Sequence, residues 1–512
     1  MTTTSPPPGG PSARSTSGSS GDGSTVADVP DRYPWIAMGI VLIGTFMVIL
    51  DTTIVNVALP QIGIELDQRD SIEWVATAYL LAVGISTPAS AWLADRHGRR
   101  TVFIGSLGLF AVASLACAMA PGLWALVGFR AVQGAGGGAL MVVGMSMIYE
   151  LFPPDKRGTA LGIWGVAAMA APAMGPVIGG YIATSVSWRW LFLVNVPIGV
   201  VGVIAAIRLL RDTGYRDRRP FDGTGLTLLA LGALALLLGF SESSSWGWSS
   251  PAVIGLLVAG PVLLALFVAH VLRTDHPVID VRMFATPTFS LSLGIICLFT
   301  MLQYGRLVFI PIELQTLRGF TPLHVGTLLI ATAAGAAITM PIGGRMADHI
   351  GARTPVLMGS ACLAASALIL ANLTLDTSQP VLVLTLFLGG VGTGLAMMPN
   401  TVAGMNSLPG RFVAQAASVR SMAREIAGSM GIAVFAAIVA AQLGGLAVDV
   451  TTADGAREAQ AAYNSVFLWA FVAVGVATVA ALFLPGKQAT LDTQAERALE
   501  AQAVIEASRD LE

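Results

Sequence analysis

Charged side chains are scarce in this chain: Asp, Glu, Lys and Arg make up 11% of its 512 residues, and lysine occurs only at positions 156 and 487. A soluble domain carries about 25% charged residues, so this composition excludes an ordinary soluble protein. Cys117, Cys297 and Cys362 fall in three different apolar stretches, which argues against a disulfide framework or a cysteine metal site. No phosphate-binding loop of the GxxxxGK[ST] type occurs either.

Apolar residues dominate instead, with a hydrophobic fraction of 54% and a mean hydropathy of +0.74. Stretches of about 20 apolar residues recur along the chain, and each is long enough to cross a hydrocarbon core of roughly 30 Å. The sequence therefore predicts an all-α polytopic membrane protein. Residues 1–33 are rich in Ser, Thr, Gly and Pro, and we expect a disordered tail there rather than a cleaved signal.

Fourteen spans are predicted, and an even number places both tails on the same side. They cover about 35–58, 72–93, 101–120, 122–148, 159–184, 190–210, 222–240, 251–271, 288–312, 322–344, 354–373, 380–400, 415–443 and 463–485. If the tails are cytoplasmic, most of the 28 lysine and arginine residues lie on the inner side, including the basic loop 208–219. Cytoplasmic loops carry such an excess, so we predict that both termini are cytoplasmic.

The chain also resembles itself. "AWLADRHGRR" follows the second span and "GRMADHIGAR" follows the tenth, with Asp95 and Asp348 separated by 253 residues (348 − 95). Two further pairs of positions repeat at similar offsets. This duplication predicts two six-helix bundles with two extra helices between them. The division is a tail at 1–33, a bundle at 34–210, the extra helices with a basic linker at 211–287, a second bundle at 288–485 and a tail at 486–512.

Four stretches resemble the motifs of one family. They are "LDTTIVNVALP" in the first span, "AWLADRHGRR" in the loop after the second, "RAVQGAGGGAL" in the fourth and "APAMGPVIGG" in the fifth. "SWRWLFLVNVPIG" after them is also typical of the group. The chain thus resembles the fourteen-span drug:proton antiporters of the major facilitator superfamily, although Ala91 and Ala171 stand where that family usually has Gly. The resemblance implies alternating access around a central cavity.

Asp51 is the most unusual residue of the first span. It lies roughly 24 Å along a helix that starts near residue 35, in the predicted outer half of the membrane. A carboxylate there costs about 2.5–3.5 kcal/mol, so it needs a partner or a cavity. Arg130 is expected at a similar depth in the fourth span, with Gln133 on the same helical stripe. The resemblance implies proton coupling by these three residues; a purely structural ion pair is the alternative.

The loop motif and its second copy are predicted to form an inner gate. Gly98 permits a tight turn, and Asp95 is expected at a helix N-terminus or paired with a neighbouring arginine. The alternative is that the motif only sets topology and turn geometry. The gate residues are Asp95, Arg96, Gly98, Arg99, Arg100, Asp348, Gly351 and Arg353. In the fifth span Gly175, Pro176, Gly179 and Gly180 are predicted to bend the helix and let its neighbours slide.

The second bundle supplies the candidates for the substrate cavity, which are Gln303, Tyr304, Arg306 and Glu313. We also expect Arg306 to pair with Asp51 in one state of the cycle. Arg420 is expected to point out of the end of its helix towards water, and Glu425 is a further titratable candidate. The five histidines show no metal-ligand spacing, and no cofactor is expected.

These features predict a proton-driven exporter of small amphipathic or hydrophobic compounds, consistent with multidrug efflux. The alternatives are export of one specific metabolite, lipid or endogenous antibiotic, and proton-coupled uptake. An intramembrane enzyme would need a catalytic constellation that the sequence does not offer. The expected partners are lipophilic small molecules, protons and the lipid bilayer, with no nucleic acid. We expect a monomer in the inner (plasma) membrane.

Overall fold

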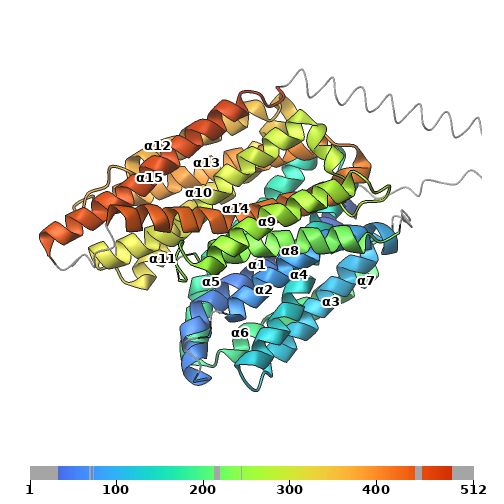
Figure 1. Cartoon of the computed structure of the whole chain (residues 1–512), viewed down its shortest axis with the longest axis horizontal. Coiled ribbons are helices and arrows are strands. Elements are labelled where there is room, and N and C mark those ends of the chain that lie inside the picture. The colour runs from blue at the N-terminus through green and yellow to red at the C-terminus, as the bar shows by residue number, and fades with distance from the viewer. Residues whose placement is uncertain are drawn as a thin grey trace, which may run out of the picture.

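A computed structural model describes residues 33–67, 71–72, 74–212, 220–243, 245–443 and 452–486. Every regular element within these ranges is a helix (Figure 1). The predicted tails, 1–33 and 486–512, lie outside the described residues apart from Tyr33 and Gly486, as does most of the basic loop.

Seven helices form the first bundle, and neighbours in space are often distant in sequence. They are α1 (Tyr33–Glu65), α2 (Trp74–His97), α3 (Arg99–Ala118), α4 (Leu123–Leu151), α5 (Arg157–Ser185), α6 (Arg189–Leu193) and α7 (Asn195–Leu209). The closest packing joins α4 to α2 and α3, and α5 to α1. Gly134 and Gly138 of α4 permit this packing, because a Cβ at either would overlap the backbone of α2. Small residues at these two positions thus allow α4 and α2 to approach closely.

Six helices form the second bundle. They are α10 (Pro287–Arg318), α11 (Pro322–Ile350), α12 (Arg353–Leu370), α13 (Gln379–Asn406), α14 (Val413–Gln442) and α15 (Ala453–Ala481), with short 3-10 turns at Val281–Ala285 and Gly410–Phe412. The helix α13 packs on α11 and α12, and α10 packs on α14 and α15. The first bundle (blue to cyan) and the second (yellow to red) lie beside each other in Figure 1.

The two extra helices, α8 (Gly223–Ser241) and α9 (Pro251–Val271), form a hairpin between the bundles in sequence. In space α8 packs against α2 of the first bundle and α14 of the second, so the hairpin covers one seam between them (Figure 1). Asp222 holds its ends together: the carboxylate accepts a 2.7 Å hydrogen bond from Gly225 N and lies 2.8 Å from His270 Nε2 at the end of α9.

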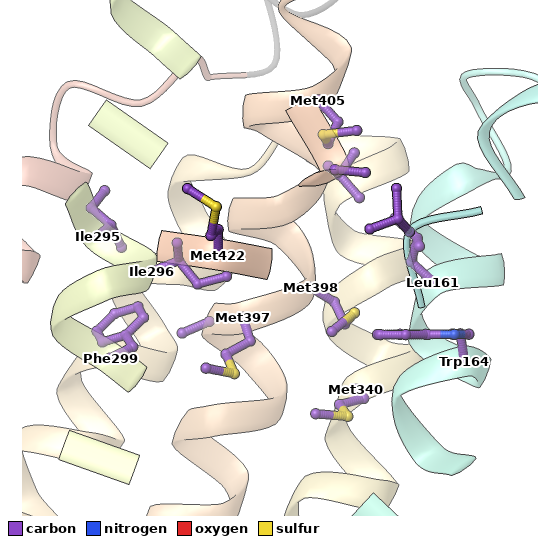
Figure 2. Packing of buried hydrophobic residues seen from close by; sticks show 14 of the residues in the cluster. Leu161, Trp164, Ile295, Ile296, Phe299, Met340, Met397, Met398, Met405 and Met422 are labelled. Atoms are coloured by element: carbon purple, nitrogen blue, oxygen red, sulfur yellow. The ribbon is translucent and has the colours of Figure 1, made fainter. Parts of the chain in front are cut away.

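Direct contact between the bundles is concentrated on α5 and α11. Buried methionines line this region, which we call the methionine seam: Met340, Met397, Met398, Met405 and Met422. Figure 2 shows Trp164 of α5 reaching towards Met398 of α13. Methionine is unbranched and polarisable, so such a surface can repack when the helices on either side move.

The predicted spans agree with these helices. Thirteen helical segments of the described residues are long and apolar enough to cross a membrane. The remaining predicted span, 159–184, coincides with the 29-residue α5. One span differs in detail, since 190–210 consists of two helices, α6 and α7, that meet at Val194. The chain is therefore a multi-pass membrane protein.

Candidate functional site

Asp51 lies at the centre of a buried polar network in the first bundle. Its side chain is 0% exposed, although α1 is otherwise apolar around it. Oδ2 accepts a 2.5 Å hydrogen bond from Arg130 Nη1, while Oδ1 accepts bonds from Asn195 Nδ2 at 2.7 Å and Gln133 Nε2 at 3.0 Å. The carboxylate therefore has three donors from two other helices, α4 and α7.

Arg130 has partners on every side. Nε donates to the Val75 carbonyl oxygen at 3.2 Å, and Nη1 also donates to Gln133 Oε1 at 2.7 Å. The guanidinium carbon lies 4.0 Å from the centre of the Tyr79 ring, which adds a cation–π contact. Gln133 in turn donates to Ser114 Oγ at 2.5 Å. Arg130 and Gln133 are both 0% exposed, so the network is a closed unit of α1, α2, α3, α4 and α7.

This arrangement matters because a buried charge is tolerated only when it is paired and hydrogen-bonded. The contacts of Asp51 therefore depend on how α1, α4 and α7 pack against one another.

Asn195 and Ser114 belong to this network and were missed in the sequence. Both are polar residues in predicted spans, and Asn195 stands in the apolar run "LFLVNVPIG". An amide in such a run is a usable signal, because it needs a hydrogen-bond partner inside the membrane. What the sequence does not provide is the rotation of α7, which directs that amide at Asp51.

A second polar contact joins the two bundles directly, and we call it the Asp348 latch. Asp348, near the end of α11, accepts hydrogen bonds from Gly158 N at 2.8 Å, Thr159 N at 2.9 Å and Thr159 Oγ1 at 3.0 Å. Gly158 and Thr159 stand in the first turn of α5, where free N–H groups and the helix dipole favour an anion. The backbones cross closely here, since a Cβ on Gly344 would overlap the Gly158 carbonyl oxygen.

Further contacts between the bundles lie next to the latch. Arg157 Nη1 donates to Asn406 Oδ1 at 3.0 Å, and Tyr149 Oη donates to the Thr401 carbonyl oxygen at 3.4 Å. All of these residues lie at the end of the molecule that carries the loop motif and its copy. In this conformation the two bundles are therefore closed against each other at that end.

The first copy of the loop motif is arranged differently from the second. Gly98 has a φ of +86° between α2 and α3, so the predicted tight turn is present, and Gly351 repeats it with a φ of +80°. Arg99 forms an ion pair with Glu150 of α4, and Arg100 Nη2 donates to the Ile207 carbonyl oxygen at 2.7 Å. These contacts stay within the first bundle. The second copy, through Asp348, instead supplies the latch between the bundles.

Three motif residues remain, and each lies at the end of a helix. The Arg96 guanidinium lies 5.3 Å from the centre of the Trp92 ring. Asp95 lies near the end of α2 and also has an interaction partner, and Arg353 is exposed at the start of α12.

The glycines of the fifth-span motif bring α5 onto α1. A Cβ on Gly175 would overlap the Thr53 side chain, and one on Gly179 would lie 2.9 Å from the Ile54 carbonyl oxygen. The contact falls less than one turn after Asp51. Pro176 and Gly180 belong to the same helix, but their surroundings lie outside the described part of the structure.

A cavity of about 200 Å³ lies mainly within the second bundle, and we call it the C-bundle cavity. Gln303 and Arg306 of α10 line it, together with apolar residues of α11, α12 and α13 and Met169 of α5. Arg306 Nη2 donates to Ser366 Oγ at 3.3 Å. In this state Arg306 is thus separate from Asp51, whose partner is Arg130, and the expected pairing of Arg306 with Asp51 is absent here.

Two other cavity candidates lie elsewhere. Glu313 is 1% exposed and accepts a 2.9 Å hydrogen bond from Gln460 Nε2 of α15. The ring of Tyr304 faces Gly428 of α14, and its hydroxyl donates to Glu425 Oε2 at 3.5 Å. A helix has 3.6 residues per turn, so Tyr304 leaves α10 about 100° away from Gln303, while Glu313 lies two turns, roughly 10 Å, beyond Arg306 on a similar side. Neither Tyr304 nor Glu313 therefore lines the C-bundle cavity.

A second cavity, of about 70 Å³, lies between the bundles and is called the seam cavity. It is lined by Met141, Met145, Trp164, Met397, Met398, Thr401, Met405, Arg420 and others. Arg420 is 6% exposed and donates to Ser292 Oγ and Thr401 Oγ1, both at 2.9 Å. The expectation that Arg420 points out towards water was wrong, because two hydroxyl groups from α10 and α13 bind it inside the bundle.

Glu425 occupies a third, smaller pocket where α2, α8 and α14 meet, with Thr77 and Ser241 beside it. Its Oε1 lies 3.5 Å from Arg424 Nη2. A second acidic residue is thus present in a cavity, next to the hairpin of extra helices.

The comparisons with known proteins all point to one family of transporters. The model of the Major Facilitator Superfamily matches residues 41–432 and 291–511. The uncharacterised MFS-type transporter YhcA of Bacillus subtilis is 34% identical over 80% of this chain and 77% of its own. The multidrug export protein EmrB of Escherichia coli K12 is 33% identical, covering 77% of each chain. The multidrug resistance protein Stp of Mycobacterium tuberculosis is 32% identical over 78% of this chain and 75% of its own.

Solved structures share the fold at lower identity. The human organic anion transporter MFSD10 superposes with a TM-score of 0.60 at 17% identity, over 86% of this chain and 99% of its own. The proton:xylose symporter XylE superposes with a TM-score of 0.59 at 13% identity, over 89% of this chain and 96% of its own.

Proposed function

Because the chain belongs to the Major Facilitator Superfamily, we propose that it is a proton-driven antiporter that exports small amphipathic or hydrophobic compounds by alternating access. We further propose that it lies in the inner (plasma) membrane as a monomer with both termini cytoplasmic. The division into two bundles and two extra helices, with the boundaries predicted above, is part of this proposal. Relatives named as multidrug exporters support the substrate class.

The observation that carries the proposal is the closed network around Asp51. The carboxylate accepts hydrogen bonds from α4 and α7 while it belongs to α1, so a change in its charge would alter contacts of three helices at once. Proton binding at Asp51 would release Arg130 from its ion pair, and the helices that hold the network would then repack. A proton moving inward brings about 2.3 kcal/mol per 100 mV of membrane potential, and each unit of pH gradient adds about 1.4 kcal/mol.

The Asp348 latch supports the alternating-access part of the proposal. It holds the bundles together at the end where we propose the cytoplasm to be, so this structure represents the state closed to the inside. The C-bundle cavity lies towards the other end: Gly326, which lines it, precedes Asp348 by 22 residues (348 − 326) along α11. That separation corresponds to roughly 33 Å along a helix.

The test is proton movement in inverted membrane vesicles with an acidic interior. Lipophilic compounds are added to the bath, and collapse of the pH gradient is recorded for the wild type, Asp51→Asn and the control Asp454→Asn, whose side chain is 97% exposed. We expect collapse in the wild type and the control, and a loss of at least about tenfold in Asp51→Asn, in the range for an essential proton carrier. Equal rates in all three would refute the role of Asp51.

The same vesicles separate the alternatives. An uptake symporter moves protons and substrate in the same direction, so substrate added to the bath would not discharge an acidic interior. An exporter of one specific metabolite, lipid or antibiotic would be silent with a broad panel and respond only to its own substrate.

A further inference from the structure

Arg306 has no acidic partner among the described residues that line the C-bundle cavity. Among the described residues no carboxylate oxygen lies within 4 Å of its guanidinium, and its hydrogen-bond partner is the neutral Ser366 hydroxyl. The fold nevertheless makes room for it, because a Cβ on Gly389 would overlap the guanidinium. Ser366 is itself fixed by donating to the Thr385 carbonyl oxygen at 2.8 Å. The fold thus fixes the position of the Arg306 guanidinium, and none of the described residues supplies a counter-ion for it.

The other residues that line the C-bundle cavity make an uncompensated charge on Arg306 unfavourable. They are largely apolar, with residues such as Phe299, Ile310, Leu329 and Leu363. A charge in such surroundings is unfavourable unless an opposite charge accompanies it. A guanidinium also presents paired N–H donors that match a carboxylate, sulfonate or phosphate group. The cavity therefore fits a molecule with an apolar body and one acidic group.

Arg420 repeats this arrangement in the seam cavity. Its two hydrogen-bond partners, Ser292 and Thr401, are both neutral hydroxyl groups, and no described carboxylate lies within ion-pair distance. Arg424, which lines the same cavity, differs because Glu425 lies 3.5 Å from it. The side chain of Met397 lines both cavities and belongs to the methionine seam in Figure 2.

We propose that the two cavities form one route for amphipathic anions, with Arg420 as the receiving cation and Arg306 as the releasing cation, separated by Met397. This inference rests on the proposed export function and specifies its substrate class. The acidic group moves from one guanidinium to the other, while the flexible methionines accommodate apolar bodies of different shape. When the bundles open at the latch, Arg420 is exposed to the substrate. In the state described here, Arg306 is the residue that is accessible to it.

The test uses three probes that share one aromatic body: naphthylacetate, the neutral naphthylacetamide and the cation naphthylmethyl-trimethylammonium. Binding to the purified chain in detergent is measured by calorimetry, independently of transport. The variants are Arg306→Gln, Arg306→Lys and Arg420→Gln. The control is Arg457→Gln, an equal charge change at a side chain that is 75% exposed.

The wild type and Arg457→Gln are expected to bind the anion more tightly than the amide or the cation. Arg306→Gln should lower anion affinity about 10- to 100-fold, as expected for loss of a charge-assisted hydrogen bond, and leave amide affinity unchanged. Arg306→Lys should recover part of the anion affinity, which a misfolded variant would not do. Arg420→Gln should reduce anion entry in vesicles more strongly than it reduces anion binding in this closed state.

Two results would overturn the inference. One is a wild type that binds the three probes equally or prefers the cation; the other is an Arg306→Gln variant that weakens all three by the same factor. A different result would refute the proposed proton-driven export and leave this inference intact. If the anion binds selectively through Arg306 but no probe moves protons in vesicles, the site stands and proton-driven export is wrong.

Discussion

Replacing Asp348 by asparagine removes the charge of the latch and keeps its size. The native carboxylate accepts three hydrogen bonds from Gly158 and Thr159 at the N-terminus of α5. Asparagine retains one acceptor oxygen and turns its NH₂ group towards N–H groups that also need an acceptor. Bonds to a charged acceptor contribute about 1.5–3 kcal/mol. Asp348 is half-buried, so screening by water reduces this figure, and we take about 1–2 kcal/mol as the loss.

That loss changes the ratio of the two bundle arrangements by about 5- to 30-fold. The latch exists only when the bundles are closed at this end, so the substitution acts on one state and shifts the equilibrium towards opening. The fraction of molecules open at the latch end should rise by that factor wherever it is small in the wild type.

The assay is a distance measurement between labels on the two bundles. Cysteines at Asp155 and Thr354 are both exposed, one before α5 and one in α12, so labels there report the separation of the bundles. The native Cys117, Cys297 and Cys362 are first replaced by alanine. In lipid nanodiscs, Asp348→Asn should populate a longer distance than either the parent or Asp454→Asn. An unchanged distance distribution in a folded Asp348→Asn protein would refute the latch.

Two further substitutions test the packing and the network. Gly344→Ala forces a Cβ onto the Gly158 carbonyl oxygen, so it should destabilise the closed chain by about 1–3 kcal/mol. Gly294→Ala meets open space inside α10 and should raise the thermal midpoint slightly, because Ala favours a helix over Gly by roughly 0.5–1 kcal/mol; equal midpoints for the two variants would contradict the close crossing. Asn195→Leu removes one donor from Asp51 and should slow substrate-driven proton movement about tenfold or more, for a loss of about 1.5–3 kcal/mol. Wild-type rates in that variant would show that Asn195 has no part in the network's function.

Hydropathy alone was sufficient to predict the helices, because each span must satisfy its backbone hydrogen bonds internally and be apolar over about 20 residues. The common depth of Asp51 and Arg130 could also be worked out, since distance along a helix follows from residue number. The structure places the two in contact at 2.5 Å. Their proposed role in proton coupling stays a prediction.

Rotation about the helix axis was the information missing from the sequence. Tyr304 leaves α10 in another direction than Gln303 and Arg306 do, and its hydroxyl contacts Glu425 of α14. Glu313 differs in depth instead, since it lies two turns beyond Arg306 and contacts Gln460 of α15. Arg420 was misjudged for the same reason, because the hydroxyls that bind it belong to other helices. The partner of Asp348 was equally inaccessible, since it depends on how the two bundles face each other.

Coupling between the proton site and the gate requires an element that both contact, and α5 meets this condition. Near one end, Gly175 and Gly179 pack on α1 just beyond Asp51. In the middle, Met169 lines the C-bundle cavity, and Trp164 donates a 3.0 Å hydrogen bond to Thr45 of α1. At the other end, its first turn is bound by Asp348.

The helix α5 is 29 residues long, which corresponds to roughly 43 Å of continuous helix. A tilt of α1 that follows loss of the Asp51–Arg130 ion pair would act on α5 through the glycine contact. Since a helix of this length moves largely as one body, the same tilt would pull its first turn away from Asp348. Proton binding in the first bundle and opening at the latch are then two consequences of one helix movement. The methionine seam, which α5 faces, is the surface that such a movement would repack.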